Sequence, residues 1–266
     1  MTQLSLMAVL AHPDDESLGT GGILAKYGAE GVATHVVTAT RGQRGRFFDN
    51  ENRPDDAEVG RVREGELRAA AAVLGVGGLR ILDGLDGELD RADHALIVRQ
   101  VAGEIRRARP QVVVTFDPFG AYGHPDHIAI SQVAGAAIVA AASPELDDGL
   151  APHGVAKLYY MAWDADAWEL YQRAFKRLVS RVDGVERQAT PWPDWAITTR
   201  VDARAHWRTV WRAVRCHETQ LPGYRGLASL GEDEHARMWG LQTFVRAHSL
   251  VNGGRAVETD LFAGLR

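Results

Sequence analysis

Short apolar runs rich in β-branched residues alternate with longer segments of helical periodicity through the first half of the chain. The runs expected to be strands are residues 4–10, 32–40, 79–82 and 112–116. The segments expected to be helices are residues 18–30, 57–74, 92–109 and 128–143. Such alternation predicts an α/β fold, in which a mainly parallel sheet carries helices on both faces.

The second half of the chain is less regular. Its expected strands are residues 155–161 and 197–201, and its expected helices are residues 170–182 and 203–216. Residues 190–195 hold two prolines and two tryptophans and are expected to be a loop. We therefore predict one domain over residues 1–266, with a Rossmann-like core at 1–135 and a C-terminal part at 136–266 that completes the same domain and its site.

Charge and composition limit the kinds of molecule that the protein is expected to bind. Thirty Lys and Arg against thirty-five Asp and Glu give a formal charge of −5, which offers no electrostatic reason to bind nucleic acid or an anionic membrane. The uncharged segment 128–143 is too short to cross a bilayer comfortably, and residues 1–10 show no export signal. A single cysteine, Cys216, fits a reducing compartment. We expect a cytoplasmic protein with a small-molecule partner.

Two dense polar clusters follow the first and fourth expected strands. Residues 11–16 read Ala-His-Pro-Asp-Asp-Glu, and residues 123–127 read Gly-His-Pro-Asp-His. In open α/β sheets, ligands bind at the carboxyl ends of strands. Both clusters are therefore expected at the ligand-binding edge of one sheet.

The residue types in these clusters suit a catalytic metal site. His12 and Asp15 are three residues apart, as are His124 and His127, so each pair faces the same way in a helical turn. Imidazole and carboxylate groups bind zinc, and three protein ligands plus a water are typical of catalytic zinc. Asp14 is a candidate base for the proton of a metal-bound water. Either cluster alone would also be typical of a helix cap or a surface loop, whereas their joint occurrence favours the metal site.

The two clusters resemble, at every position, the two signature motifs of the LmbE-like or PIG-L zinc-dependent N-deacetylases. The first 135 residues or so match that family in order. Further matching segments are Thr-Ala-Thr-Arg-Gly at 38–42, Arg-Glu-Gly-Glu-Leu at 63–67, Asp-Gly-Glu-Leu at 86–89 and His-Glu-Thr-Gln at 217–220.

The resemblance implies a division of roles within the clusters. The implied metal ligands are His12, Asp15 and His127. Asp14 is the implied base, while a protonated His124 stabilises the oxyanion and Asp126 keeps that ring charged and oriented. The expected metal is Zn²⁺, although two histidines and one carboxylate also suit Fe²⁺.

The resemblance also implies residues that contact substrate. Arg63 and Asp86 would recognise sugar hydroxyls, although an arginine in such a helix is often part of a solvated salt-bridge face. Tyr122 matches a position whose ring covers the acyl group, and as sequence alone it is a loop aromatic. His217 and Gln220 either close one wall of the site or partner the last carbonyls of a helix.

Two other features fit a small-molecule site less directly. Gly19, Gly21 and Gly22 do not form a dinucleotide fingerprint, because carboxylates stand where its first glycines belong, so we expect them to let the helix pack closely on the sheet or to line the metal pocket. Four arginines near the long loop could attract an anionic substrate group, with a solvated loop as the alternative, and they are Arg41, Arg44, Arg46 and Arg61.

The metal-site motifs and the family resemblance together imply an enzyme that removes an acetyl group from an N-acetylglucosamine unit of a small amino-sugar molecule. The lead-in at residues 120–123 is more similar to the family's inositol-sugar branch than to its malate branch. The alternatives are a conjugate amidase that cleaves a larger amide on the same scaffold, and a sugar- or metal-binding module without turnover. Family members are often oligomers, so a homo-oligomer is also an option.

Overall fold

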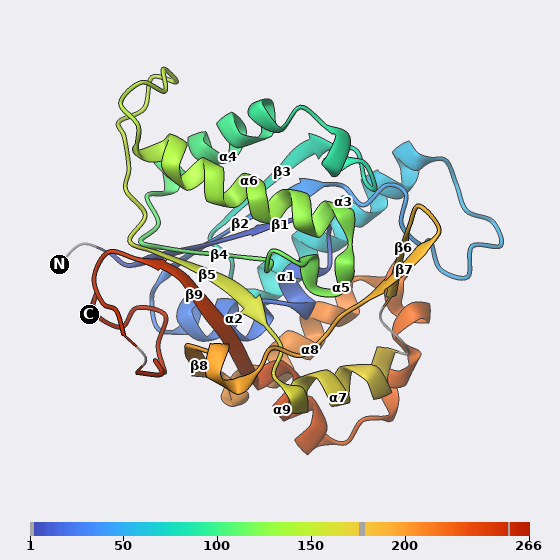
Figure 1. The fold of residues 1–266 in the computed structure, drawn as a ribbon. Coiled ribbons are helices and arrows are strands. Elements are labelled where there is room, and N and C mark those ends of the chain that lie inside the picture. Colours follow the sequence, from blue (N-terminus) through green and yellow to red (C-terminus); the bar gives the residue numbers. More distant parts are fainter. Residues whose placement is uncertain (1–2, 176–178, 255) are drawn as a thin grey trace.

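The computed structural model describes residues 3–175, 179–254 and 256–266 (Figure 1). In this part of the chain the main sheet has seven strands: β1 (Ser5–Leu10), β2 (Ala33–Thr40), β3 (Gly78–Gly84), β4 (Val112–Thr115), β5 (Lys157–Ala162), β8 (Thr199–Asp202) and β9 (Leu241–Ser249). Their order across the sheet is β3-β2-β1-β4-β5-β9-β8. A separate hairpin is formed by β6 (Val179–Val182) and β7 (Val185–Gln188).

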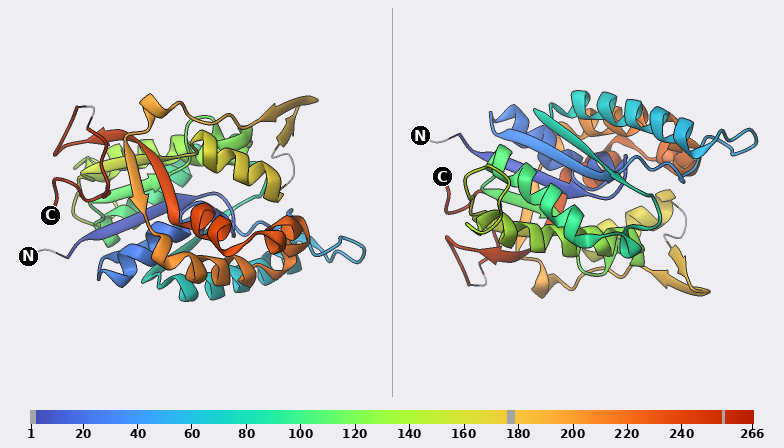
Figure 2. Two further views of the ribbon diagram at one scale, coloured as in Figure 1. Left: turned by 90° about the horizontal axis from the view of Figure 1, so that it is seen from below. Right: turned by 90° about the horizontal axis from the view of Figure 1, so that it is seen from above.

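Helices cover both faces of this sheet, as expected for an α/β fold. The longer ones are α2 (Gly21–Ala29), α3 (Asp56–Leu74), α4 (His94–Ala108), α6 (Pro125–Ala142), α7 (Ala165–Phe175), α8 (Trp207–Cys216) and α9 (Glu232–Gly240). The short helices α1 (Asp15–Leu18) and α5 (Gly120–Gly123) follow β1 and β4. Figure 2 shows α4 and α6 together on one face and α2, α3 and α8 on the other. The predicted fold class is confirmed.

The direction of the strands places a ligand-binding crevice at β1 and β4. β1 pairs in parallel with both β2 and β4, and β9 alone runs against its neighbours in the described sheet. The chain adds β2 and β3 on one side of β1, then returns to add β4 and β5 on the other. Such a reversal of strand order leaves a crevice at the carboxyl ends of the two central strands.

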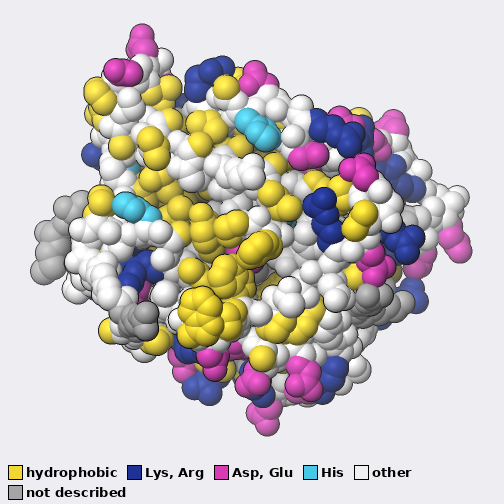
Figure 3. All heavy atoms as spheres, in the orientation of Figure 1, with side chains coloured by type: hydrophobic (Ala, Val, Ile, Leu, Met, Phe, Trp, Pro, Cys, Tyr) yellow, Lys and Arg dark blue, Asp and Glu magenta, His cyan; other side chains and the backbone are white. Residues whose placement is uncertain are grey.

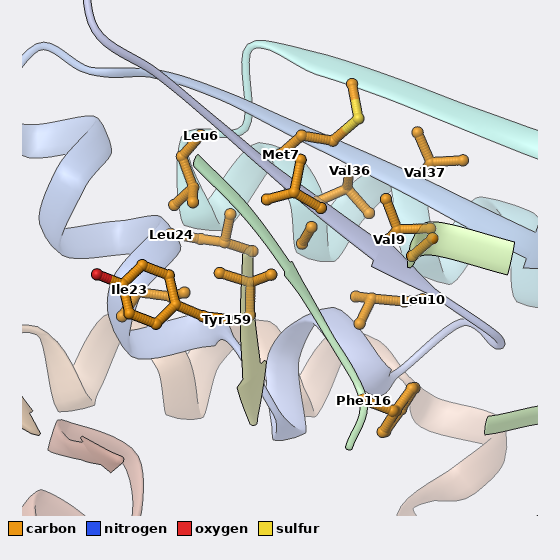
Figure 4. Packing of buried hydrophobic residues seen from close by; sticks show 14 of the residues in the cluster. Leu6, Met7, Val9, Leu10, Ile23, Leu24, Val36, Val37, Phe116 and Tyr159 are labelled. Carbon is orange, nitrogen blue, oxygen red and sulfur yellow. The ribbon is translucent and has the colours of Figure 1, made fainter. Parts of the chain in front are cut away.

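The core lies on both sides of the central strands (Figure 4). All six residues of β1 are buried, as expected for a parallel strand covered on both faces. Ile23 and Leu24 of α2 pack against it from one side, and Tyr159 of β5 lies in the same cluster. The carboxyl end of β1 is therefore held rigidly.

Two of the glycines after β1 allow helices to approach closely. A Cβ at Gly21 would lie 2.8 Å from Val210 Cγ1 of α8, and a Cβ at Gly22 would lie 2.5 Å from the Trp239 carbonyl oxygen of α9. Both distances are too short for a real side chain. The closest contact at each of these positions is thus with another helix, whereas we expected packing on the sheet, and Gly19 lines the cavity described below.

The sequence prediction for the second half is wrong or incomplete in several elements, of which two are instructive. The expected helix at 170–182 is α7 up to Phe175 and strand β6 from Val179, with residues 176–178 outside the described residues. An Asp183-Gly184 turn, with φ of 51° and 77°, closes the β6–β7 hairpin, and this dipeptide is a hairpin signal that should have ended the predicted helix. Strand β9 was not predicted, because its sequence shows no regular apolar alternation.

The surface visible in Figure 3 carries both signs of charge. Lys and Arg side chains intermingle with Asp and Glu around its rim, and hydrophobic side chains gather towards the middle. Among the described helices, none combines the length and the apolar character that a membrane-spanning segment requires.

A buried ionic cluster fixes the C-terminal segment to the sheet. Glu258 accepts hydrogen bonds from Lys157 Nζ at 2.8 Å and from the Tyr159 hydroxyl at 2.6 Å, both on β5. Arg246 of β9 lies 2.8 Å from the same carboxylate. Burial disfavours the charged form, but the bonds from Lys157 and Tyr159 outweigh it and lower the pKa of Glu258 to about 2. The folded state therefore stabilises the ionised form of the Glu258 carboxylate.

Replacing Glu258 with Gln should lower the free energy of unfolding at pH 7 by about 2 to 3 kcal/mol. A lowered pKa stabilises the fold above the ordinary carboxyl value of 4.5, and this contribution declines as the pH falls towards 2. Urea unfolding of both proteins at pH 7 and pH 3 measures the difference. The exposed Glu51→Gln serves as control, and an equal difference at both pH values would refute the assignment.

Candidate metal centre and active site

The two His-Pro-Asp clusters meet at the carboxyl ends of β1 and β4. His12 to Asp15 follow β1 and enter α1, while His124 is the N-cap of α6 and Pro125 occupies its first turn. A proline there costs no hydrogen bond, because the first amides of a helix have no intrahelical acceptor. Since β1 and β4 are hydrogen-bonded neighbours, the two loops face one another across a single crevice.

Three side chains converge on one point in this crevice. His12 Nδ1 lies 3.3 Å from His127 Nε2. Oxygens of the Asp15 carboxylate lie 3.7 Å from His12 Nδ1 and 3.6 Å from His127 Nε2. In a tetrahedral zinc site with bonds of about 2.0–2.1 Å, ligand atoms are separated by about 3.3–3.4 Å. The three donor atoms therefore have the spacing of a metal-binding triad.

The chemistry of the donor set also fits a divalent cation. Two imidazole nitrogens that face one another at 3.3 Å can both act as lone-pair donors only when a cation lies between them. Burial lowers the pKa of His127 well below its ordinary value, so its ring is neutral, as a metal ligand must be. The candidate His/Asp metal site is thus present, and its donor types suit zinc and iron(II) alike.

Carboxylates surround His12 on several sides. Its Nε2 lies 3.0 Å from Asp126 and 3.2 Å from Asp86. Burial opposes protonation, but the bonds to Asp126 and Asp86 raise the pKa of His12 to about 10, so without a metal its ring carries a proton that a bound cation would displace. For Asp15, burial favours the neutral carboxyl group and raises its pKa to about 7. This concentration of buried negative charge requires a positive partner, and a divalent cation provides one.

The geometry of Asp126 differs from the expectation for it. Its carboxylate bonds to His12 and accepts the backbone amides of Gly87 and Leu89, at 2.7 and 3.0 Å, rather than contacting the His124 ring. The reason is local: His124 Nδ1 accepts the Asp126 backbone N–H at 3.2 Å as the cap of α6. Burial and the charge on His12 lower the pKa of His124 to about 4, so this ring is neutral with its proton on Nε2.

Arg63 and Asp86, the expected sugar-recognition pair, both line the cavity. Arg63 is only 3% exposed, which rules out the solvated salt-bridge face. Its guanidinium donates to the carbonyls of Gly42 and Pro13 at 2.8 and 2.5 Å. Asp86 accepts the Arg44 amide at 3.0 Å, and although burial opposes ionisation, the bond with His12 lowers its pKa to about 2.

Tyr122 also lines the cavity, as expected for a residue near the acyl group. Its ring centroid lies 5.4 Å from that of His127 and 5.9 Å from that of His124. The preceding Ala121 has a φ of +63°, a conformation that costs free energy for a residue with a side chain. The loop backbone is therefore held in a strained form that places the Tyr122 ring over the donor atoms.

His217 and Gln220 reach the site from the C-terminal part. Gln220 lines the cavity and donates to the Arg46 carbonyl at 2.6 Å, so it forms part of the wall. His217 is fully buried and bonds to Glu16 at 2.7 Å, so it lies beneath the site and supports the loop after β1. Among the arginines near the long loop, Arg41 pairs with Glu64 and Asp83 on the surface.

The sequence interpretation missed three aromatic residues of the second half. Trp163, Tyr171 and Tyr224 line the cavity, which has a volume of about 300 Å³. Tyr224 belongs to η4 (Glu218–Ser229), a run of 3-10 turns with Pro222 inside and no apolar periodicity. No local sequence signal therefore pointed to Tyr224, and only its position in the fold reveals it.

Sequence comparisons place this site among known deacetylases. A family model described as PIG-L, GlcNAc-PI de-N-acetylase, matches residues 7–138. A 1D-myo-inositol 2-acetamido-2-deoxy-α-D-glucopyranoside deacetylase from Thermobispora bispora is 32% identical, with 100% of both chains covered. The enzyme of the same name from Thermomonospora curvata is 38% identical over 83% of this chain and 82% of the relative.

Comparisons with solved structures support the fold. The 4-carboxy-2-hydroxymuconate hydratase from Pseudomonas putida is 21% identical, with a TM-score of 0.70 over 96% of this chain and 100% of the other. The N,N'-diacetylchitobiose deacetylase from Pyrococcus horikoshii is 20% identical, with a TM-score of 0.65 over 91% and 83%. Since this fold carries both a hydratase and a deacetylase, it does not by itself define the reaction.

Replacing His127 with Ala should reduce the metal content of purified, metal-loaded protein from about one ion per chain to a small fraction of that, because one of three protein ligands is lost. Elemental analysis after gel filtration measures the stoichiometry. The exposed His248→Ala should keep its full content. Equal metal content in the two variants would contradict the assignment of His127 as a ligand.

Proposed function

Because this chain belongs to the PIG-L family of de-N-acetylases, it is an N-deacetylase hydrolase, and we propose that it acts on 1D-myo-inositol 2-acetamido-2-deoxy-α-D-glucopyranoside. The observation that carries the proposal is identity of 32% over the whole of both chains with a deacetylase of that name, combined with the His/Asp cluster in the cavity. The products are acetate and the free amine of the amino sugar.

The cavity supports an uncharged polyol as the group attached to the amino sugar. Arg63 and Asp86 line it, and their side chains make directional hydrogen bonds of the kind that ring hydroxyls accept and donate. Two cationic side chains of the long loop, Arg41 and Arg44, are already paired with carboxylates. These two arginines therefore do not offer an unpaired charge to an anionic group such as malate.

We propose His12, Asp15 and His127 as the ligands of the metal, with Zn²⁺ as the first candidate. A bound divalent cation supplies a Lewis acid, which lowers the pKa of water and polarises the amide carbonyl. Asp14 accepts the proton of the attacking water, because its carboxylate lines the cavity beside Asp15. A base held next to its target in this way gains the advantage of a fixed orientation.

His124 donates a hydrogen bond to the acyl oxygen as negative charge develops there. Its Nδ1 accepts the Asp126 amide, so the ring proton lies on Nε2, and the ring lines the cavity. A fixed donor of this kind stabilises a tetrahedral intermediate more than it stabilises the planar amide. The Asp126 carboxylate accepts the amides of Gly87 and Leu89 and bonds to His12 Nε2. Its role is therefore to hold this loop and the His12 ring in position.

A substrate comparison tests the proposal. Protein stripped of metal and reloaded with zinc or iron(II) should release amine from the inositol glycoside with a kcat/KM at least about tenfold above that for N-acetylglucosamine or its malate glycoside. Metal-free protein should be inactive. Preference for the malate glycoside would refute the substrate, and metal binding without release from any of the three would favour a larger amide or a binding module.

Replacing Asp14 with Ala should lower kcat by about 10² to 10⁴ while the bound metal stays at its normal stoichiometry, because the base is lost and the ligands are kept. Amine release and elemental analysis on the same preparation measure both quantities. Retention of more than about half of the wild-type kcat would remove Asp14 from the role of base.

A further inference from the structure

Tyr224 makes a short hydrogen bond to the proposed base. Its hydroxyl donates to Asp14 Oδ2 at 2.6 Å, across 210 positions of sequence. The ring also lines the cavity. Burial, followed by the charge of Asp14, raises the pKa of Tyr224 well above its usual value, so the hydroxyl keeps its proton and acts as a donor.

A second donor reaches the same oxygen. Arg63 Nη2 lies 3.3 Å from Asp14 Oδ2. In the described part of the chain, both hydrogen bonds of the Asp14 carboxylate thus fall on Oδ2. The carboxylate is 14% exposed and borders the cavity, so Oδ1 is the oxygen left to accept a proton from a water there.

The backbone of Asp14 is strained, and it is supported indirectly by His217, which caps the η4 segment that carries Tyr224. The φ of Asp14 is +103°, in the left-handed region that a residue with a side chain adopts only at a cost in free energy. Its N–H donates to Glu16 Oε2 at 3.0 Å, and Glu16 Oε1 is bonded to His217 at 2.7 Å. His217 and Tyr224 therefore support the main chain and the side chain of Asp14, respectively.

We propose that Tyr224 is a positioning residue for deacetylation, which holds Asp14 by Oδ2 so that Oδ1 faces the attacking water. This inference rests on the proposed function, in which Asp14 is the base. Without the hydroxyl, the carboxylate keeps its contact with Arg63 but loses the bond that opposes rotation about its terminal bond. Misplacement of a reacting group by about 1 Å can cost about 10²-fold in rate.

Replacing Tyr224 with Phe should lower kcat by about 10- to 100-fold, leave KM within about twofold and leave the metal content unchanged. The matched control is Tyr27→Phe. Tyr27 is another buried tyrosine whose hydroxyl donates to a carboxylate, Asp260, at 2.8 Å, and it does not line the cavity. The Tyr27 variant should lose stability and keep kcat, which separates positioning from a general loss of a buried hydrogen bond.

A double variant tests whether Tyr224 acts through Asp14. In the Asp14→Asn background, the further change of Tyr224 to Phe should reduce the residual rate by less than about twofold, because there is no base left to orient. Full additivity of the two losses would overturn the inference, as would an unchanged kcat in the single Tyr224 variant.

The contact itself can be followed without turnover. The chain has six tyrosines, so labelling with ¹³Cζ-tyrosine gives a small set of signals, and the one missing from Tyr224→Phe belongs to Tyr224. That signal should shift in Asp14→Ala, while the Tyr27 signal stays in place. An unchanged Tyr224 signal would refute the contact. Absence of amine release from wild type would instead refute the proposed function.

Discussion

The parallel pairing of β1 with β4 is the contact on which the site depends. Neither His-Pro-Asp cluster supplies all three proposed ligands by itself, because His12 and Asp15 follow one strand and His127 follows the other. Backbone hydrogen bonds between the two strands bring these loops together, and burial of every β1 side chain prevents the strands from shifting. Hydrogen bonds between backbone groups of two strands thus determine the spacing of the candidate metal-binding atoms.

Many residues around this crevice serve to offset its buried negative charge. Several carboxylates lie near one another where water is largely excluded, and each needs donors or a cation. The chain supplies backbone amides to Asp126 and Asp86, and a guanidinium and a phenol to Asp14. The amides of Gly87 and Arg44 come from loops, so the order of these loops is tied to the charge that they neutralise.

The sequence predicted elements and motifs that depend on residues close together in the chain. It did not reveal contacts between residues that are far apart in the chain. The strands of the first half were predicted because each contains an apolar run, and the candidate metal ligands could be proposed because each motif is continuous in the sequence. The position of His217 beneath the site depends on Glu16, and the role of Tyr224 depends on a partner far along the chain. We expected the Asp126 carboxylate to orient His124, whereas the Asp126 backbone N–H bonds to His124 and its carboxylate bonds to His12.

The position of the donors along the chain has a consequence for biosynthesis. The last of the three proposed ligands, His127, leaves the ribosome about a hundred residues before Tyr224 does. A growing chain therefore contains all three proposed ligands before it contains the hydroxyl that bonds to Asp14. If those residues bind a cation, the donors for it are synthesised well before the segment that supports the proposed base.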